Sequence, residues 1–237
     1  MAARLEPAGA VLLTDSMHFS KPLLRLMAPM ALLAVSLSWA LPARADGLSD
    51  LESFLRQIRQ GRASFTQVVT PPRRDGEAAS RSKTSSGSFE FLRPSRFRFH
   101  YVKPFEQLIV ADGQTLWLYD ADLNQATARR QQEVLGNTPA ALIATASDLK
   151  GLSGLFTLVN APDADGQQWV LATPKARDGQ LQSIRLGFRQ GQLATLEMLD
   201  SFGKRSVMQF GPLDTQSGFK PGHFAFQPPA GADVLRQ

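Results

Sequence analysis

The stretch Arg96-Phe97-Arg98-Phe99-His100-Tyr101 alternates basic or imidazole side chains with aromatic ones. Successive side chains of a β-strand point to opposite faces, so a period of two places the aromatic rings on one face and the polar groups on the other. The same alternation extends back towards Ser88. The sequence therefore predicts extended structure over Ser88 to Tyr101, with one apolar and one charged face.

Other parts of the chain repeat this pattern. Apolar and polar side chains alternate in 184–189, 196–198 and 208–210, and residues 63–70 are rich in β-branched and aromatic side chains. Pairs that favour tight hairpin turns occur at Asp112-Gly113, Asp178-Gly179 and Gln190-Gly191. We expect these strands to form one large antiparallel sheet.

Helices are few in this prediction. Apolar residues recur at spacings of three and four over Leu48 to Ile58, which indicates an amphipathic helix. Asp46 or Ser49 is expected to cap its start, and Gly61 to follow its end.

A second helix is predicted to begin at Pro139, with Thr138 as its N-cap, and to continue to Ala146. Residues 148–155 form a further short helical turn or a loop. The polar stretch Pro71 to Gly87 has no apolar period and is expected to be a mobile loop.

The fold class that follows is mainly β with a helical lid (α+β). A long sheet with one continuous apolar face must curl, and the few helices cannot cover it with a thick core. The sequence thus predicts that the concave side of the sheet is an apolar cavity.

The start of the chain has the features of an export signal. Lys21 and Arg25 precede the uncharged run Leu26 to Leu41, and Ala43-Arg44-Ala45 fits a cleavage site before Asp46. The alternative is a retained anchor, but the run contains Pro29 and is shorter than the ~20 residues that span a bilayer. We expect residues 1–45 to be removed, with Met17 as a possible true start, and residues 46–237 to form one periplasmic domain.

Composition argues against several classes of function. The chain has no cysteine, so it has no disulfide and no site for lipid attachment after the signal. Its net charge of +5 comes from dispersed residues without a nucleic-acid-binding motif. His100 and His223 are far apart, and Asp120 and Asp122 lack further carboxylates at loop spacing, so no catalytic site, metal or cofactor is expected.

Several short strings occur in an order that resembles the LolA family of outer-membrane lipoprotein carriers. They run from the first predicted helix to the chain's end: Ala63-Ser64-Phe65-Thr66-Gln67, Arg93-Pro94, Asp112-Gly113 with Thr115-Leu116-Trp117 and Tyr119, Gly136-Asn137-Thr138-Pro139, Thr173-Pro174-Lys175, and Phe224-Ala225-Phe226-Gln227-Pro228-Pro229. The resemblance implies an unclosed antiparallel β-barrel around an apolar cavity, lidded by helices.

The resemblance also implies a function. Such a carrier is a monomer that takes lipoproteins from an ABC-type release complex of the inner membrane, crosses the periplasm and delivers them to LolB, an outer-membrane receptor. Two alternatives stay open: a carrier or sensor of another amphiphile on the same fold, and a secreted hydrolase with an unrecognised site.

The family pattern assigns roles to particular residues. Arg93 matches the arginine that ties the lid to the barrel through backbone carbonyls, and Phe97 matches a position at the mouth or interior of the cavity. A surface arginine and ordinary sheet core are the alternatives. The other candidate cavity residues are Phe99, Tyr101, Trp117, Leu118, Met198, Met208 and Phe210 on strands, and Leu142 and Ile143 on the predicted lid helix.

Overall fold

The computed structural model describes residues 46–72, 81–135, 144, 146, 148–176 and 180–237. The described strands and helices are, in chain order, α1 Gly47–Gln57, β1 Gln60–Thr70, β2 Lys83–Leu92, β3 Arg96–Lys103, β4 Gln107–Asp112, β5 Thr115–Asp120, β6 Gln125–Arg130, α2 Gln131–Leu135, α3 Leu149–Leu155, β7 Phe156–Ala164, β8 Gln167–Pro174, β9 Leu181–Arg189, β10 Gln192–Asp200, β11 Arg205–Phe210 and β12 Asp233–Arg236.

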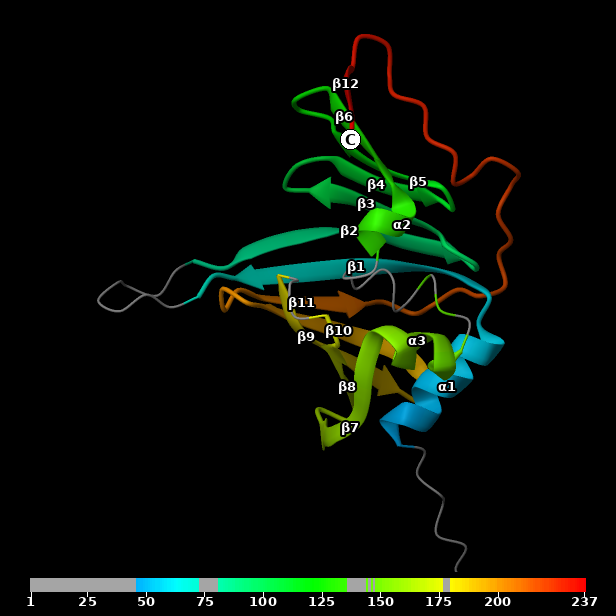
Figure 1. Cartoon of the computed structure of the whole chain (residues 1–237), viewed down its shortest axis with the longest axis vertical. Coiled ribbons are helices and arrows are strands. Elements are labelled where there is room, and N and C mark those ends of the chain that lie inside the picture. Colours follow the sequence, from blue (N-terminus) through cyan, green and yellow to red (C-terminus); the bar gives the residue numbers. More distant parts are fainter. Residues whose placement is uncertain (1–45, 73–80, 136–143, 145, 147, 177–179) are drawn as a thin grey trace, which may run out of the picture. The chain divides into compact units, whose positions relative to one another are not determined.

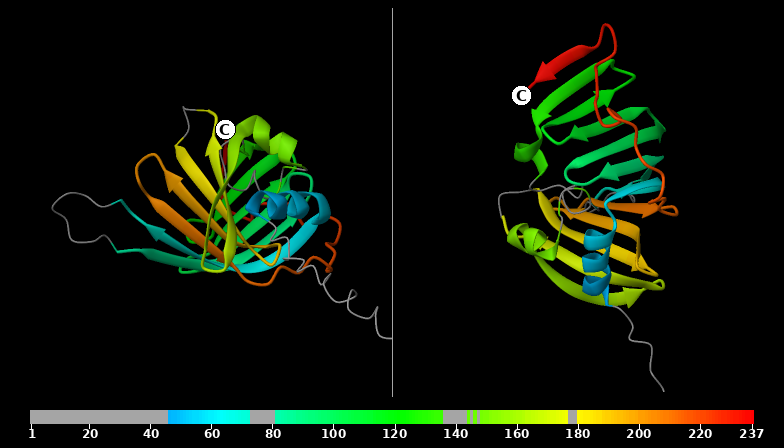
Figure 2. Two further views of the ribbon diagram at one scale, coloured as in Figure 1. Left: turned by 90° about the horizontal axis from the view of Figure 1, so that it is seen from below. Right: turned by 90° about the vertical axis from the view of Figure 1, so that its right-hand side faces the viewer.

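The strands form one curled sheet of 12 strands in the order β12-β6-β5-β4-β3-β2-β1-β11-β10-β9-β8-β7 (Figures 1 and 2). Neighbours are antiparallel, apart from β12, which pairs in parallel with β6. In the described part of the chain, β12 and β7 form the two edges and do not pair with each other. The predicted unclosed, mainly β architecture is confirmed, and the parallel edge strand is an addition to it.

The register of the sheet places the aromatic residues of neighbouring strands on the same face. Phe97 lies opposite Phe91, and Phe99 lies opposite Phe89. The Phe89 and Phe99 rings stack with centroids 4.4 Å apart. Aromatic pairs of this kind stabilise by about 0.5–1.5 kcal/mol beyond their burial, so the alternation quoted above builds the main core of the protein.

Helix α1 covers part of this apolar face. Its N-cap is Asp46, whose carboxylate accepts a 2.8 Å bond from the backbone N–H of Ser49. Leu51, Phe54 and Leu55 are buried against the sheet, and each such burial is worth about 1.5–3 kcal/mol. The helix contacts β7, β8, β9 and β10, so it lies over that half of the concave face (Figure 2).

The short stretch at 148–155 is a helix, α3, with Asp148 as its N-cap. The side chain of Asp148 accepts a 2.7 Å bond from the N–H of Gly151. Leu152 of α3 is buried in the same core as α1. The segment therefore adds a second helical cover to the concave face.

Two expected hairpin turns are confirmed. Gly113 and Gly191 both have positive φ, of 106° and 74°, where a side chain would be strained. The turn at Asp112 is also held by its carboxylate, which accepts bonds from the N–H groups of Gln114 and Thr115. The turn at Asp178-Gly179 and the helix start at Thr138-Pro139 lie outside the described residues.

Three local expectations were wrong. The extended stretch from Ser88 is interrupted at 93–95, where Ser95 has a φ of 64° and the chain turns from β2 to β3. Strand β2 begins at Lys83, inside the stretch assigned to a loop, because β1 continues far enough to pair with it.

The third concerns Gly61, which is not next to the end of α1. The helix ends at Gln57, and Gly61 lies within β1, where an added Cβ would stand 2.7 Å from Leu213 and 2.8 Å from Phe91. Close packing, and not helix capping, is the reason for glycine here.

The C-terminal segment, residues 211–232, runs from β11 to β12 along the outer face of the sheet (Figure 1). There Val110, Trp117, Ala126 and Ala128 form a second hydrophobic cluster, covered by Phe226 of this segment. The outer face is thus partly closed by the chain itself. Among the described helices, none is long and apolar enough to cross a membrane.

Candidate functional site

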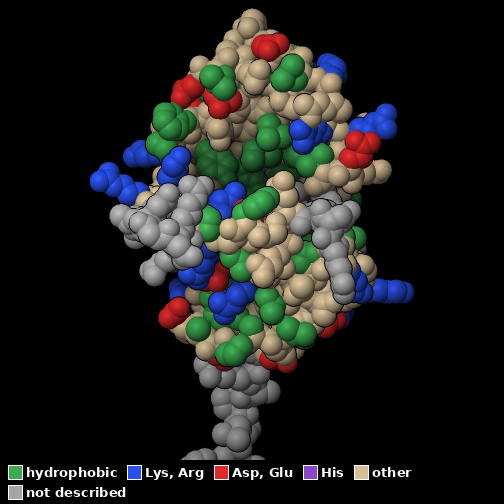
Figure 3. Space-filling model, turned by 60° about the vertical axis from the view of Figure 1, so that its left-hand side comes forward, with side chains coloured by type: hydrophobic (Ala, Val, Ile, Leu, Met, Phe, Trp, Pro, Cys, Tyr) green, Lys and Arg blue, Asp and Glu red, His purple; other side chains and the backbone are tan. Residues whose placement is uncertain are grey.

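The concave face brings together most of the predicted cavity residues. Phe97, Phe99 and Met208 are buried in the main core cluster, and Tyr101, Met198 and Phe210 pack against it half-buried. They come from β3, β10 and β11, and β3 and β10 are separated by three other strands in the sheet. Figure 3 shows a hollow on one face of the molecule, with hydrophobic side chains inside it.

Trp117 and Leu118 do not share a face. Leu118 lies opposite Ile109, a neighbour of the main core, and is 41 % exposed. Trp117 points to the outer face, where its ring lies 5.4 Å from that of Phe226. Adjacent residues of a strand must point to opposite sides, so the placement of Trp117 in the cavity is corrected.

The predicted cavity residues Leu142 and Ile143 lie outside the described residues. Of that region the structure describes Ala144 and Ala146, and both are buried in the main core. The backbone carbonyl of Ala144 accepts a 3.0 Å bond from the N–H of Ser95. Ala144 therefore contacts the turn that follows Arg93.

Arg93 connects the sheet to α1. Its Nη1 donates a 3.3 Å bond to the carbonyl of Phe54 and a second bond to the carbonyl of Ile58. The carbonyl of Phe54 also accepts a 3.1 Å bond from the N–H of Ile58, so Arg93 adds a second donor to it. A cation near the C-terminal end of a helix also complements the negative end of the helix dipole. One guanidinium thus binds two carbonyls at the end of α1 and holds it against the sheet.

The surroundings of Arg93 are apolar. Its side chain is 6 % exposed and lies over the rings of Phe54 and Phe91, at 4.9 and 5.1 Å from their centroids. Burial, and secondly the charge of Arg59, lower the pKa of Arg93 to about 10. The group therefore remains charged at neutral pH, held by carbonyl dipoles and aromatic faces.

Sequence comparison supports one family. The family model for the outer membrane lipoprotein carrier protein LolA matches residues 56–227. The outer-membrane lipoprotein carrier protein of Albidiferax ferrireducens is 61 % identical over 199 residues, covering 82 % of this chain and 93 % of the relative. The outer-membrane lipoprotein carrier protein of Leptothrix cholodnii is 50 % identical over 207 residues, covering 87 % of this chain and 93 % of the relative.

This chain belongs to the LolA family. A solved LolA superfamily protein from Nitrosomonas europaea aligns with a TM-score of 0.44 at 13 % identity, over 76 % of this chain and 96 % of that one.

In this LolA-family chain the sequence did not reveal what surrounds Arg93. The side chain of Gln131 is 2 % exposed; it donates a 2.6 Å bond to the carbonyl of Ser95 and accepts a 2.9 Å bond from the N–H of Gly113. It thus joins the turn after Arg93 to the β4–β5 turn. Glutamine has no sequence pattern that marks such a role, so only the three-dimensional arrangement identifies it.

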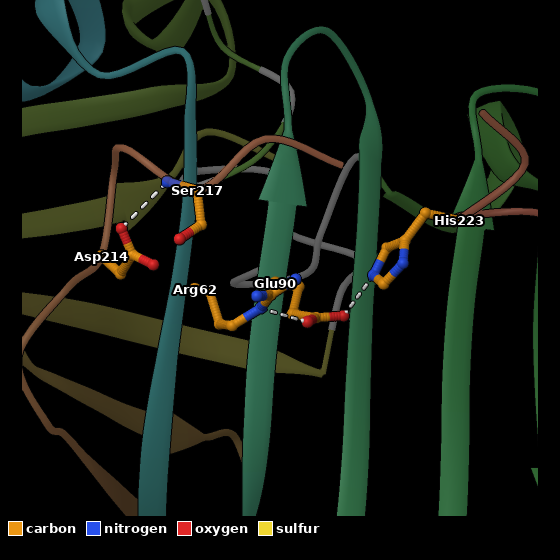
Figure 4. A network of polar contacts seen from close by, with 5 residues as sticks. All are labelled: Arg62, Glu90, Asp214, Ser217 and His223. Carbon is orange, nitrogen blue, oxygen red and sulfur yellow. Dashed lines mark hydrogen bonds and ion pairs between the residues drawn. The ribbon is translucent and has the colours of Figure 1, made fainter. Parts of the chain in front are cut away.

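The outer face of this LolA-family protein carries a polar network (Figure 4). Glu90 accepts bonds of 2.6 Å each from Arg62 of β1 and His223 of the C-terminal segment. Burial would raise the pKa of Glu90, but the bonds from His223 and Arg62 and the charges of these two residues outweigh it and lower the pKa. The network fastens the C-terminal segment to the sheet. In the part of the chain described, no group of three or more potential metal ligands occurs.

Proposed function

We propose that this protein is a periplasmic carrier that shields the acyl chains of lipoproteins on the concave face of its sheet. The observation that supports it best is the continuous aromatic and aliphatic lining of that face beneath a helix fastened by one arginine. Family membership supports the same cargo, because the relatives are named outer-membrane lipoprotein carrier proteins.

The energetics of the cargo require such a lining. Each methylene transferred into water costs ~0.8 kcal/mol, so an acylated protein does not cross an aqueous compartment unshielded. A carrier must also release its cargo. A lining without specific polar contacts to the methylene chains binds them through contact area alone and leaves the strength of binding adjustable by the lid.

We further propose that Arg93 supplies this adjustment. Acyl chains that enter beneath α1 must move the helix, and the two bonds from Arg93 to Phe54 and Ile58 then break. The cost of breaking them opposes loading and favours release. The donor in this exchange is an ABC-type release complex of the inner membrane, and the acceptor is the receptor LolB.

Extraction of the native protein tests the cargo. The full chain is expressed with a C-terminal tag, purified from the periplasm under mild conditions and extracted for mass spectrometry. Intact acylated lipoproteins are the expected co-purifying species. Free phospholipid or fatty acid alone would assign the protein to another amphiphile, and deacylated products formed on incubation would indicate a hydrolase.

Fractionation of the same cells tests whether the protein is periplasmic. Cleavage after Ala45 predicts a mature protein that starts at Asp46 and fractionates with the periplasm. Mass analysis of the amino terminus measures this directly. An intact segment 1–45 in the membrane fraction would contradict the proposed location.

A further inference from the structure

Three polar side chains form a hydrogen-bonded row across the concave face. The hydroxyl of Tyr101 donates a 3.1 Å bond to Oε1 of Gln67, and Nε2 of Gln67 donates a 2.7 Å bond to Oγ of Ser206. They come from β3, β1 and β11. We call this row the polar ledge.

Local geometry allows the ledge to cross β2. Gly87 of β2 lies opposite Phe65 on one side and opposite Tyr101 on the other. Because Gly87 has no side chain, the Tyr101 ring reaches Phe65 over it, with centroids 5.0 Å apart, and its hydroxyl reaches Gln67. A Cβ at Gly87 would stand 1.9 Å from the carbonyl oxygen of His100, so no other residue fits this backbone.

The ledge marks a boundary along the concave face. On its inner side lie Phe65, two residues before Gln67, and Phe99, two residues before Tyr101, both buried in the core. On its outer side is an open pocket of about 460 Å³, lined by Gln67, Val69, Gln180, Leu181, Met198, Asp200, Lys204 and Ser206. The apolar lining therefore changes to a mixed polar one at this row.

The ledge retains hydrogen-bonding capacity towards the pocket. The carboxamide of Gln67 has two N–H groups, and its bond to Ser206 uses one of them. The hydroxyl of Ser206 accepts that bond and keeps its own proton to donate. A ligand carbonyl placed in the pocket would thus meet two donors from neighbouring strands.

We infer that the polar ledge binds the carbonyl groups of acyl esters, at the point where acyl chains leave the apolar cavity. This inference rests on the proposed carrier function and adds to it a site that sets how deeply the chains enter. Ester carbonyls are shared by lipoprotein anchors and phospholipids, so the ledge recognises the acyl ester and the experiment separates the two sources.

The test uses a matched pair of synthetic lipopeptides, identical except that one has a diacylglyceryl and the other a dialkylglyceryl group. An ether oxygen has no carbonyl to accept these bonds. The purified mature protein should bind the ester form about tenfold more tightly, as expected for one or two hydrogen bonds. Gln67→Leu and Ser206→Ala should each reduce the ratio of ester to ether affinity towards one. Their affinity for the ether form should stay within about twofold of that of the wild-type protein.

Gln209→Leu is the matched control, because this glutamine is exposed on β11 and lies on the opposite face from Met208. It should retain the full ester preference. A diacyl phospholipid and its dialkyl analogue form the second arm. If the protein prefers the ester in the phospholipid pair as well, the ledge binds acyl esters in general. If it prefers the ester in the lipopeptide pair alone, the ledge is specific for the lipoprotein anchor.

Two failures are distinguishable. Equal affinity of the wild-type protein for ester and ether lipopeptides overturns the ledge while leaving the carrier function intact. Absence of binding to either lipopeptide contradicts the carrier function itself. An ester preference that survives Gln67→Leu and Ser206→Ala would also overturn the assignment of these residues.

Discussion

On the concave face of the sheet, aromatic side chains contact one another and helix α1, whereas the outer face is covered by the C-terminal segment and carries ion pairs. Phe89, Phe97 and Phe99 form a continuous cluster with α1. Trp117 packs instead on Phe226, and Glu90 is fixed by Arg62 and His223. The inner contacts involve helix α1, which Arg93 binds, and the outer contacts involve the C-terminal segment, which leads into β12.

By the proposed function, this difference places cargo binding on the inner face, and the outer face contributes stability. A carrier needs a surface that exchanges one cover for another, and the inner face has a cover fastened by Arg93. On the outer face, Glu90 and Phe226 hold the C-terminal segment through separate contacts. Substitutions that are chemically alike should therefore have different consequences on the two faces.

The largest expected effect is that of Phe97→Glu compared with Trp117→Glu. A carboxylate at either buried position is strongly disfavoured. At Phe97, the proposed movement of α1 would let water reach the carboxylate. The sheet should therefore stay folded, while lipoprotein transfer is abolished. At Trp117 the carboxylate lies under Phe226, so the melting temperature should fall. The amount of lipoprotein transferred per folded molecule should be unchanged.

Circular dichroism melting, measured beside a transfer assay, distinguishes the two variants. Complete unfolding of Phe97→Glu would show that the inner aromatics are fixed core and not an exchangeable lining. That result would remove the distinction between the faces.

The next effect is expected for Arg93→Leu. Loss of its bonds to α1 should make loading easier and release harder, by ~1–3 kcal/mol for one or two charge-assisted bonds. Acceptance from inner-membrane vesicles should be normal or improved, and delivery to receptor-bearing vesicles poor. Arg93→Lys should have a smaller effect on delivery, since lysine keeps the positive charge but lacks the planar guanidinium with its several N–H donors.

Arg59→Leu is a suitable control for Arg93, because it removes a neighbouring charge without removing the bonds to Phe54 and Ile58. It should deliver cargo normally. Unchanged delivery by Arg93→Leu, or equal losses at both steps, would show that the arginine does not regulate the lid.

The smallest effect concerns acid stability of the outer face. The folded-state pKa of Glu90 lies below its ordinary value of 4.5, so its pairing stabilises the fold above that pH and is lost as pH falls through the folded value. Glu90→Gln should lower the free energy of unfolding at pH 7 by up to ~1 kcal/mol and flatten its decline in acid.

Glu106→Gln offers a matched comparison, since Glu106 pairs with His100 at 2.9 Å but is 61 % exposed. Urea unfolding between pH 3 and pH 7 should show little change for this variant. An equal change in both variants would mean that burial of the Glu90 network contributes nothing. Transfer should be unaffected by either substitution.

The sequence predicted the sheet well because a period of two is a direct consequence of strand geometry. It predicted α1, two candidate caps of which Asp46 is the one used, and two hairpin turns for similar local reasons. The same rule, applied to Trp117 and Leu118, would have separated them, since neighbours on a strand cannot share a face.

The remaining parts of the site depend on contacts between residues far apart in the chain. Arg93 binds the carbonyls of Phe54 in α1 and of Ile58 just after it, and Gln67 binds side chains on β3 and β11. Neither Arg93 nor Gln67 lies in a sequence pattern that predicts its hydrogen-bond partners. The parallel pairing of β12 with β6 likewise depends on the course of the C-terminal segment across the sheet.

The central claim, that acyl chains occupy the concave face, is tested most directly by fluorescence quenching. Both described tryptophans, Trp117 and Trp169, lie on the outer face, since they alternate with core residues on their strands. A lipopeptide with brominated acyl chains should bind without quenching them and should quench a tryptophan placed on the inner face by Phe99→Trp. Quenching of Trp117 and Trp169 by the bound lipopeptide, with Phe99→Trp unaffected, would contradict the account.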